Sequence, residues 1–287
     1  MLLLTGATGF IGRSIQKQLT TRAIPFRVYD DNINNFIYLR ETLADINTVI
    51  HLAGAESFGR KKIIQQIDVN GTDTLIKAAR FHNLSQIIYL SRLNATPHSH
   101  YRLLRAKGEA ERLLRQSGLP YTIIRSATLF GKEDRFTNAI ASTATWSWPF
   151  VFLPKNGETV MQPLWVEDLA RCVVDTIGRK NFLNQTIELA GNERLHYRDI
   201  VKLVLAAASL RRTPLNIRPQ MARGINRLTA WLFLRPMLTR FDHDRMSMAE
   251  ITDLNTVSDQ FGFQPARLHT HLAHLRRRDG FRRLWQG

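Results

Sequence analysis

Two patterns of apolar residues alternate along the first two thirds of the chain. Short apolar runs are typical of buried strands, and apolar residues repeated every three or four positions are typical of amphipathic helices. The apolar runs predict strands over residues 1–6, 25–31, 48–54, 86–91, 121–131 and 185–191. The helical spacing predicts helices over residues 12–22, 37–46, 68–83, 102–118 and 166–179. This alternation indicates an α/β, Rossmann-type doubly wound parallel sheet with right-handed crossovers.

Beyond residue 195 the pattern becomes mostly helical and less regular. We therefore predict a doubly wound domain over residues 1–195 and a small, mostly helical C-terminal lobe over residues 196–287. Two apolar stretches, at 146–154 and 228–238, are interrupted by proline or arginine. Both are shorter than the ~20 apolar residues that a membrane span needs. We expect them to lie in the core or between the lobes, rather than to act as membrane anchors.

The charge is strongly positive, with 40 Lys and Arg against 24 Asp and Glu, a formal net charge of +16. Such a charge favours anionic partners, which include nucleic acid, anionic lipid and acidic proteins. The Arg-rich C-terminus at 276–287 could contact an anionic membrane surface or an acidic protein, or it could be a solvated tail. No nucleic-acid-binding motif is present, so nucleic acid is not favoured.

Cysteine usage and the first residues bear on location. The chain has a single cysteine, Cys172, and its first residues lack the pattern of a secretory signal. A single cysteine suits a reducing compartment, because it can form no intramolecular disulfide. We expect a cytoplasmic location, either free or peripheral at the inner face of the membrane. No His, Asp or Glu cluster has metal-ligand spacing, so no metal site is predicted.

Three glycines, Gly6, Gly9 and Gly12, lie three residues apart between the first predicted strand and the first predicted helix. In this context the first glycine permits a tight turn, the second lets the backbone approach a pyrophosphate, and the third lets the helix pack closely. The helix N-terminus adds N–H groups and a positive dipole end. Seven residues of this loop are candidates for phosphate contact: Thr5, Gly6, Thr8, Gly9, Phe10, Ile11 and Gly12.

Several further blocks follow the loop in a characteristic order: VIHLAGAE at 49–56, DVNGTDTL at 68–75, YLSRLNA at 89–95, the run at 105–131 and QPLWVEDLA at 162–170. Together with the glycine loop, over roughly residues 1–190, they resemble the extended and atypical short-chain dehydrogenase/reductase superfamily. The chain is most similar to its NAD-dependent epimerase/dehydratase-like, NmrA-like group, which includes the NAD(P)H-binding accessory subunit of respiratory complex I. The stretch LFGKEDRF at 129–136 resembles that subunit.

This resemblance implies a Rossmann fold, a bound nicotinamide dinucleotide and a cleft for a small-molecule substrate under the C-terminal lobe. It also adds Leu52, Ala53 and Gly54, which end the third predicted strand, to the expected cofactor contacts. His51 before them is expected to be structural, and Asp168 is expected to cap or anchor a helix near the cleft.

The superfamily's catalytic pair is Tyr-x-x-x-Lys on one helix, and here only the lysine matches. Lys107 takes the position of the lysine that holds the nicotinamide ribose in the family, so it is also an expected cofactor contact. Leu103 stands four residues earlier and has no proton to give. Tyr101 is six residues before Lys107, about 240° around a regular helix. It could reach the site from an irregular helix start, or it could be an ordinary aromatic residue at a helix N-terminus. Ser91 could contact substrate, or it could cap a strand end.

The adenosine end of the site departs from the family as well. Only about twenty residues separate Asp30 from the next strand, so a helix–strand pair common in the family is predicted to be missing. Asp30 or Asp31 lies where a carboxylate would accept the ribose 2′-hydroxyl, although both could simply belong to a solvated turn. A carboxylate there repels a 2′-phosphate, so NAD is favoured over NADP. Asp68 also replaces an asparagine that the family commonly carries.

Three functions remain open from the sequence. The first is an NAD(P)-binding accessory or sensor protein without standard Tyr-x-x-x-Lys catalysis. The second is an active nucleotide-sugar epimerase, dehydratase or reductase with a rearranged proton donor. The third is a membrane-peripheral protein like the complex I accessory subunit.

Overall fold

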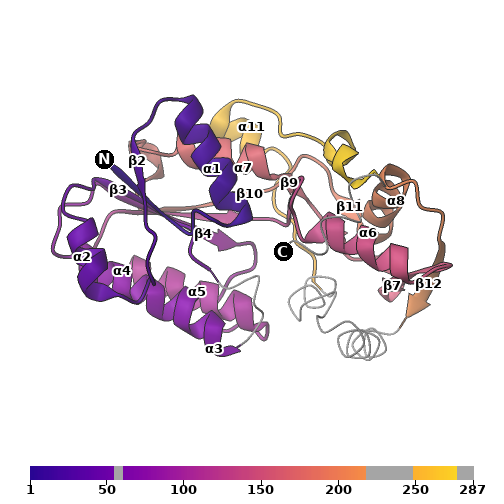
Figure 1. The fold of residues 1–287 in the computed structure, drawn as a ribbon, viewed down its shortest axis with the longest axis horizontal. Helices are drawn as coiled ribbons and strands as arrows, with labels where there is room; N and C mark the ends of the chain where they lie inside the picture. Colours follow the sequence, from indigo (N-terminus) through magenta and orange to yellow (C-terminus); the bar gives the residue numbers. More distant parts are fainter. Residues whose placement is uncertain (55–60, 218–247, 277–287) are drawn as a thin grey trace. The chain divides into compact units, whose positions relative to one another are not determined.

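The computed structural model describes residues 1–54, 61–217 and 248–276. The chain divides into two compact units (Figure 1). Unit 1 contains residues 1–126 and 166–189, and unit 2 contains residues 127–165 and 190–287. The predicted boundary after residue 195 does not follow this interleaved division, and it stays a prediction. The predicted role of the Arg-rich end at 277–287 and that of the stretch at 228–238 lie outside the described residues.

Unit 1 is built on a six-stranded sheet in which every neighbouring pair of strands is parallel. The strand order is β10-β5-β4-β3-β1-β2. The strands are β1 (Leu2–Thr5), β2 (Phe26–Val28), β3 (Thr48–His51), β4 (Gln86–Arg92), β5 (Tyr121–Ser126) and β10 (Gln185–Leu189). The carboxyl ends of these parallel strands share one edge of the sheet, which is where such folds bind ligands.

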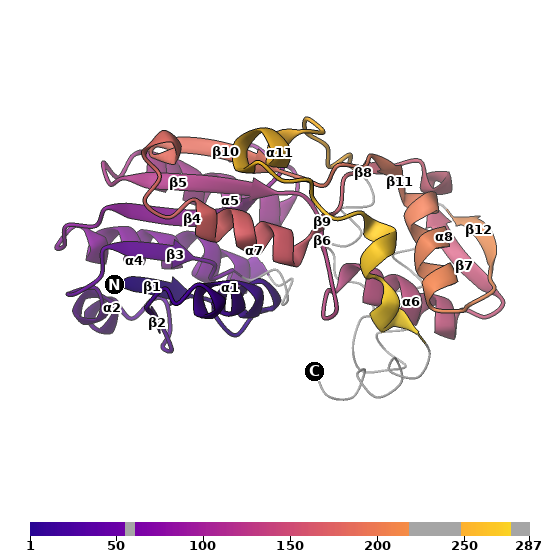
Figure 2. The same ribbon diagram turned by 90° about the horizontal axis from the view of Figure 1, so that it is seen from above.

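Helices cover both faces of this sheet, as Figures 1 and 2 show. Helices α1 (Phe10–Thr21) and α7 (Val166–Asp175) pack together on one face. The opposite face carries three helices, α2 (Phe36–Thr42), α4 (Gly71–Ala79) and α5 (Arg102–Arg115). A short helix α3 (Lys61–Ile64) and a π-helix (Gln65–Asn70) lead into α4. The predicted Rossmann-type doubly wound fold is confirmed.

The β2 edge of the sheet carries the shortening that the sequence predicts. A single helix, α2, connects β2 to β3, and β3 pairs with β1 on the side away from β2. In the described part of the chain, β2 is therefore the last strand on this side of the sheet. The adenosine end of the predicted site lies at the carboxyl end of this edge strand.

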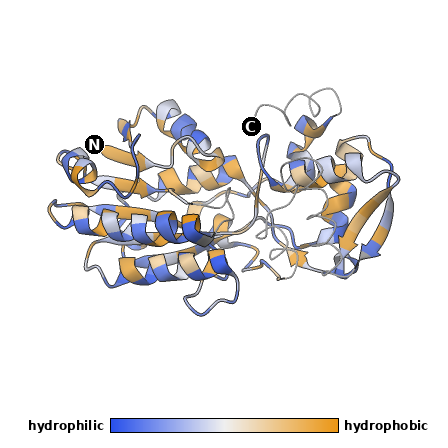
Figure 3. Cartoon of the chain, turned by 60° about the horizontal axis from the view of Figure 1, so that its bottom comes forward, coloured by the Kyte–Doolittle hydropathy of each residue, from blue (hydrophilic) through white to orange (hydrophobic). Residues whose placement is uncertain are grey.

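The core of unit 1 forms where apolar strand residues meet the inner faces of the helices. Leu3, Val49 and Ile87 come from three adjacent strands and are almost completely buried. Leu75 of α4 and Leu114 of α5 pack against them. In Figure 3 the strands of the sheet are mostly hydrophobic, whereas the outer helices alternate between hydrophobic and hydrophilic positions. The apolar residues that recur at helical spacing in the sequence thus form one buried face on each helix.

In its described residues, unit 2 combines helices with three small two-stranded sheets. The strand pairs are β6 (Leu129–Phe130) with β9 (Leu164–Trp165), β7 (Phe150–Pro154) with β12 (Thr213–Ile217), and β8 (Val160–Met161) with β11 (Leu195–His196). The α-helices described in this unit are α6 (Phe136–Trp146), α8 (Tyr197–Ala207) and α11 (Thr256–Phe261). Its core contains Phe130, Ile140, Met161, Ile200 and Val204.

The apolar stretch at 146–154 is only partly buried. Val151 and Leu153 lie in the core of unit 2, as expected. Trp146 and Trp148 are 51% and 75% exposed, so the expectation of a buried segment is wrong for its first half. Among the helices that the structure describes, none is long and apolar enough to cross a membrane.

Candidate functional site

The glycine loop connects β1 to α1 at the carboxyl edge of the sheet. Gly6 has φ +69, and a Cβ on it would lie 2.8 Å from the backbone nitrogen of Ala53. A Cβ on Gly12 would lie 2.4 Å from the carbonyl oxygens of Gly6 and Ala7. Gly9 differs, because the nearest atom to its added Cβ is 3.4 Å away. The fold itself therefore requires glycine at positions 6 and 12, whereas a Cβ at position 9 would make only an ordinary contact with the carbonyl oxygen of Gly6.

The first turn of α1 is suited to an anion. Gly9 is the N-cap and supplies no side-chain cap, and the first turn contains no acidic residue. The backbone N–H groups of Phe10 and Ile11 are at the positive end of this 12-residue helix. Thr8 is exposed, and its carbonyl accepts a hydrogen bond from the Arg13 guanidinium. Arg13, directly after the third glycine, was not among the predicted contacts and places an exposed cation beside the loop.

The end of β3 lies against this loop. A Cβ on Gly6 would be 2.8 Å from the Leu52 carbonyl carbon as well as from the Ala53 nitrogen. Leu52, Ala53 and Gly54 are all partly exposed. The fold thus brings together the two backbone segments that were expected to contact the cofactor, one from the β1–α1 loop and one from the end of β3.

Thr5 is directed into the sheet. Its hydroxyl lies 2.7 Å from His51 Nδ1 and accepts the N–H of Ala53 at 3.4 Å. His51 Nε2 lies 3.2 Å from the Thr72 hydroxyl, which donates to the Asp68 carbonyl at 2.7 Å. Since the Thr72 proton is already used, His51 donates from Nε2 and accepts the Thr5 proton at Nδ1. The Thr5 hydroxyl thus ties β1 to β3 beside the glycine loop, and His51 has the structural role expected of it.

Lys107 is buried, with 3% of the residue exposed. Its Nζ lies 3.0 Å from Asp68 Oδ1 and donates to the carbonyl of Leu90 at 3.1 Å. The same ammonium lies 5.1 Å from the centre of the Tyr89 ring. A Cβ on Gly54 would be 3.2 Å from both Asp68 Oδ1 and Lys107 Nζ, so the backbone at Gly54 covers the pair. Lys107 is thus held by partners within the protein, and the replacement at Asp68 supplies the opposite charge.

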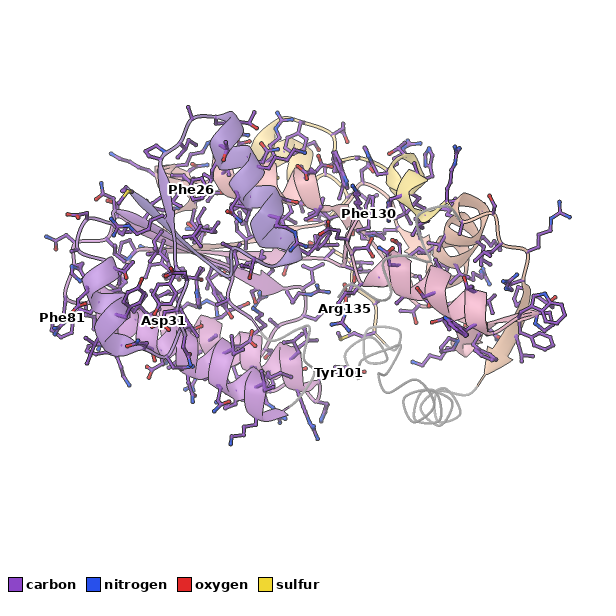
Figure 4. The ribbon with its side chains drawn as sticks, in the orientation of Figure 1. Phe26, Asp31, Phe81, Tyr101, Phe130 and Arg135 are labelled. Atoms are coloured by element: carbon purple, nitrogen blue, oxygen red, sulfur yellow. The ribbon has the colours of Figure 1, made fainter. Side chains whose placement is uncertain are left out.

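The tyrosine position of the catalytic pair is occupied by Leu103, as the sequence indicates. Leu103 lies in the first turns of α5 and is buried. Tyr101 is the N-cap of α5, in an extended conformation with φ −85 and ψ 120, and it is partly exposed (Figure 4). It therefore lies just outside the helix that carries Lys107.

Ser91 belongs to a buried polar network. Its hydroxyl donates to Glu111 Oε1 at 2.6 Å, and Glu111 is completely buried. Arg125 also binds Glu111 through Nε at 3.0 Å and Nη2 at 2.8 Å, and Arg115 adds a contact at 2.8 Å. The hydrogen bonds that Arg125 donates to Glu111 are the largest cause of a raised pKa for Arg125. The Ser91 hydroxyl proton is thus already donated inside the domain.

The two candidate acids at the end of β2 are both exposed. Asp30 accepts a hydrogen bond from the Tyr38 hydroxyl at 2.9 Å, and this contact is the largest cause of a raised pKa for Tyr38. Asp31 accepts the backbone N–H of Asn32 at 2.6 Å and the side-chain amide of Asn35 at 2.5 Å. These hydrogen bonds hold both carboxylates at the edge of the sheet. Asp31, which is labelled in Figure 4, also orders the turn.

Burial, with the positive charge of Lys107 as a second cause, lowers the pKa of His51 from 6.5 to about 3. The unfolded chain therefore binds more protons than the folded protein between about pH 3 and pH 6.5. We expect the free energy of unfolding to fall as the pH drops through this range, by about 2 kcal/mol at about pH 5 from His51 alone. Denaturant titrations of wild type and His51→Gln at several pH values measure this contribution. The same pH dependence of the free energy of unfolding in wild type and His51→Gln would contradict this contribution.

A scan against protein-family models matches residues 26–146 to the NAD(P)H-binding family. Among curated proteins, the chain is 26% identical to NADH dehydrogenase [ubiquinone] 1 alpha subcomplex subunit 9 of Rattus norvegicus, over 95% of this chain and 78% of the relative. It is 24% identical to the photosystem II assembly factor Ycf39 of Cyanophora paradoxa, over 70% of this chain and 67% of that protein.

Solved structures agree on the fold. A nucleoside-diphosphate-sugar epimerase from Staphylococcus aureus superposes with a TM-score of 0.75 at 19% identity, over 95% of this chain and 99% of that one. Within the described residues, no group of three or more His, Cys, Asp or Glu side chains could hold a metal ion. The chain is homologous to alpha subcomplex subunit 9 and to Ycf39, its residues 26–146 match an NAD(P)H-binding domain, and its fold is Rossmann-like.

Proposed function

We propose that this chain binds a nicotinamide dinucleotide as a structural or sensing ligand, performs no hydride transfer of its own, and acts as an accessory protein. One observation carries the proposal: Lys107, the only matching member of the catalytic pair, is buried in an ion pair with Asp68 at 3.0 Å. An ammonium held this way leaves a buried carboxylate uncompensated if it turns toward a ribose.

Two further positions support the absence of hydride transfer. Leu103 stands where the family's tyrosine donates a proton, and its side chain is buried. The Ser91 hydroxyl donates to Glu111 at 2.6 Å. By contrast, the start of α1, which would bind phosphate, has no side-chain cap and no acidic residue in its first turn. Binding without chemistry is therefore the best-supported function for this site.

The relatives suggest how such a protein could work. One is named as a subunit of NADH dehydrogenase and the other as an assembly factor of photosystem II. Both names describe proteins that act in or on a larger complex. We infer that this chain likewise works by association with a protein partner, in the cytoplasm or at the inner face of the membrane.

The alternative is an epimerase, dehydratase or reductase that acts on a small molecule with a rearranged proton donor. The observation that favours it is the partly exposed Tyr101, which lies at the N-cap of the helix that carries Lys107. Tyr101 would then donate the proton that Leu103 cannot.

An activity assay separates these two functions. We expect no turnover above the protein-free rate when the protein is mixed with NAD⁺ and UDP-glucose, or with NADH and a soluble quinone. The measurements are nicotinamide absorbance and chromatography of the sugar nucleotide, and dinucleotide released from the purified protein is quantified in parallel. Steady turnover that falls on the order of 10²–10⁴-fold in Tyr101→Phe, but not in the control Tyr121→Phe, would establish the alternative.

We infer that the ligand is NAD(H) rather than NADP(H), because Asp30 and Asp31 put two exposed carboxylates at the end of β2. We expect NADH to bind at least about tenfold more tightly than NADPH by calorimetry. Asp30→Asn keeps an acceptor for the Tyr38 hydroxyl and removes one negative charge. The difference between the NADH and NADPH affinities should therefore become smaller. The control Asp45→Asn, which neutralises another exposed acid, should leave this difference unchanged. Tighter binding of NADPH by the wild type would refute the assignment.

The glycine loop offers a test of dinucleotide binding that is separate from folding. Gly9→Ala should lower the free energy of unfolding by no more than about 1 kcal/mol, as for other N-cap exchanges to alanine, and should weaken NADH binding. Gly12→Ala should destabilise the protein on the order of 3 kcal/mol, because its Cβ meets two backbone oxygens. Thermal unfolding with and without NADH gives both quantities. Unchanged NADH affinity in Gly9→Ala would argue against binding at this loop.

A further inference from the structure

One end of unit 2 exposes four large apolar side chains. Trp146, Trp148, Phe150 and Leu215 are 51%, 75%, 40% and 42% exposed, and we call this set the tryptophan tip. Trp146 ends α6, and Phe150 begins β7 four residues later. The strand pairing brings Leu215 beside them, because β12 runs parallel to β7 with Leu215 opposite Phe152. The four residues therefore gather on neighbouring elements.

The order of side chains along β7 makes this surface unusual. Val151 and Leu153 point into the core of unit 2 and are buried. The alternate positions, Phe150 and Phe152, lie on the opposite face and are at least partly exposed. A strand with one solvated face normally carries polar residues on that face. Here both faces of the strand are apolar, so water alone does not account for the outer one.

The segments that carry the tip contain cations but no acidic residue. Residues 136–157 and 203–217, which include α6, β7 and β12, contain no Asp or Glu. They contain three cations, Lys155, Arg211 and Arg212. Arg212 Nε donates to the Ala144 carbonyl near the end of α6, and its Nη1 donates to the Arg211 carbonyl at 2.7 Å. These bonds hold a guanidinium close to the residue that begins the tip, Trp146.

We propose that the tryptophan tip is a docking surface for an anionic lipid bilayer. Indole rings sit favourably at the headgroup level of a bilayer, where one side of the ring is apolar and the other is wet. Arginine and lysine beside them are attracted by anionic headgroups, and the formal net charge of +16 draws the whole chain toward such a surface. This is peripheral binding, and it is independent of the dinucleotide site in unit 1.

The bilayer accounts for the tip better than an acidic protein does. Cations suffice to attract an acidic protein, whereas the most exposed large apolar side chain of the tip is Trp148, at 75%. Interfacial membrane binding uses both parts together, since the buried apolar area and the electrostatic attraction add. An acidic protein partner is therefore the competing outcome of the test.

The test is co-sedimentation of the full chain with vesicles at low salt. We expect binding to phosphatidylcholine vesicles that contain phosphatidylglycerol, and little binding to phosphatidylcholine alone. Replacing both tip tryptophans (Trp146→Ser with Trp148→Ser) should lower the bound fraction on the order of tenfold. Replacing both tip arginines (Arg211→Gln with Arg212→Gln) should weaken binding mainly at low salt, because salt screens charge.

Matched controls come from unit 1. Ile37→Ser with Phe81→Ser removes two exposed apolar side chains, and Arg102→Gln with Arg105→Gln removes two exposed cations. Both controls should bind vesicles like the wild type. Circular dichroism melting checks that each variant is folded. NADH affinity should be unchanged in the tip variants, so failure of this proposal is distinguishable from failure of the dinucleotide site.

Three results would overturn the proposal. The first is equal vesicle binding by the wild type and the double tryptophan variant. The second is loss of all binding when residues 277–287 are deleted, which would assign the interaction to the Arg-rich end. The third is equally strong binding to polyglutamate that does not depend on the tip tryptophans, which would indicate an acidic protein partner instead. A blue shift of tryptophan emission on vesicle binding, absent in the double tryptophan variant, would support it.

Discussion

The buried ion pair between Lys107 and Asp68 is the interaction on which the arrangement of the candidate site depends. It joins α5 to the π-helix before α4, and the backbone at Gly54 closes over it. A buried charge without its partner is costly, and removing one member of such a pair typically destabilises a protein by about 3–5 kcal/mol. An asparagine at position 68 would offer the lysine a neutral partner. The carboxylate offers a full opposite charge, and so it holds the ammonium inside the domain.

The same region shows how one buried network can fix the geometry of a binding loop. His51 accepts from Thr5 and donates to Thr72, which in turn bonds the backbone of Asp68. Burial keeps His51 neutral by lowering its pKa to about 3. A neutral ring can accept and donate at once, whereas a protonated ring could only donate. The neutral state thus links the β1 end of the glycine loop to the segment that carries the ion pair.

The fold was predictable from the sequence because its signals are local. Alternating apolar runs and helical spacing gave the order of strands and helices, and the short interval after Asp30 predicted the missing helix–strand pair. The glycine loop was predictable for the same reason. The partners of Lys107 and Ser91 were not, because Asp68 and Glu111 lie 39 and 20 residues away along the chain and meet them only through packing. The exposure of Trp146 and Trp148 was missed because an apolar run shows hydrophobicity but not which half faces the core.

Binding and chemistry can separate in this fold because they depend on different elements. Phosphate binding would use the backbone between β1 and α1, where the packing of the chain requires glycine at positions 6 and 12 but not at position 9. Hydride chemistry would use side chains of α5, where Leu103 is buried and Lys107 is paired. Changes on α5 therefore need not disturb the loop. The fold requires glycine at positions 6 and 12 but not at position 9, which is compatible with a ligand at this loop. The buried Leu103 and the paired Lys107 on α5 do not require that ligand to react.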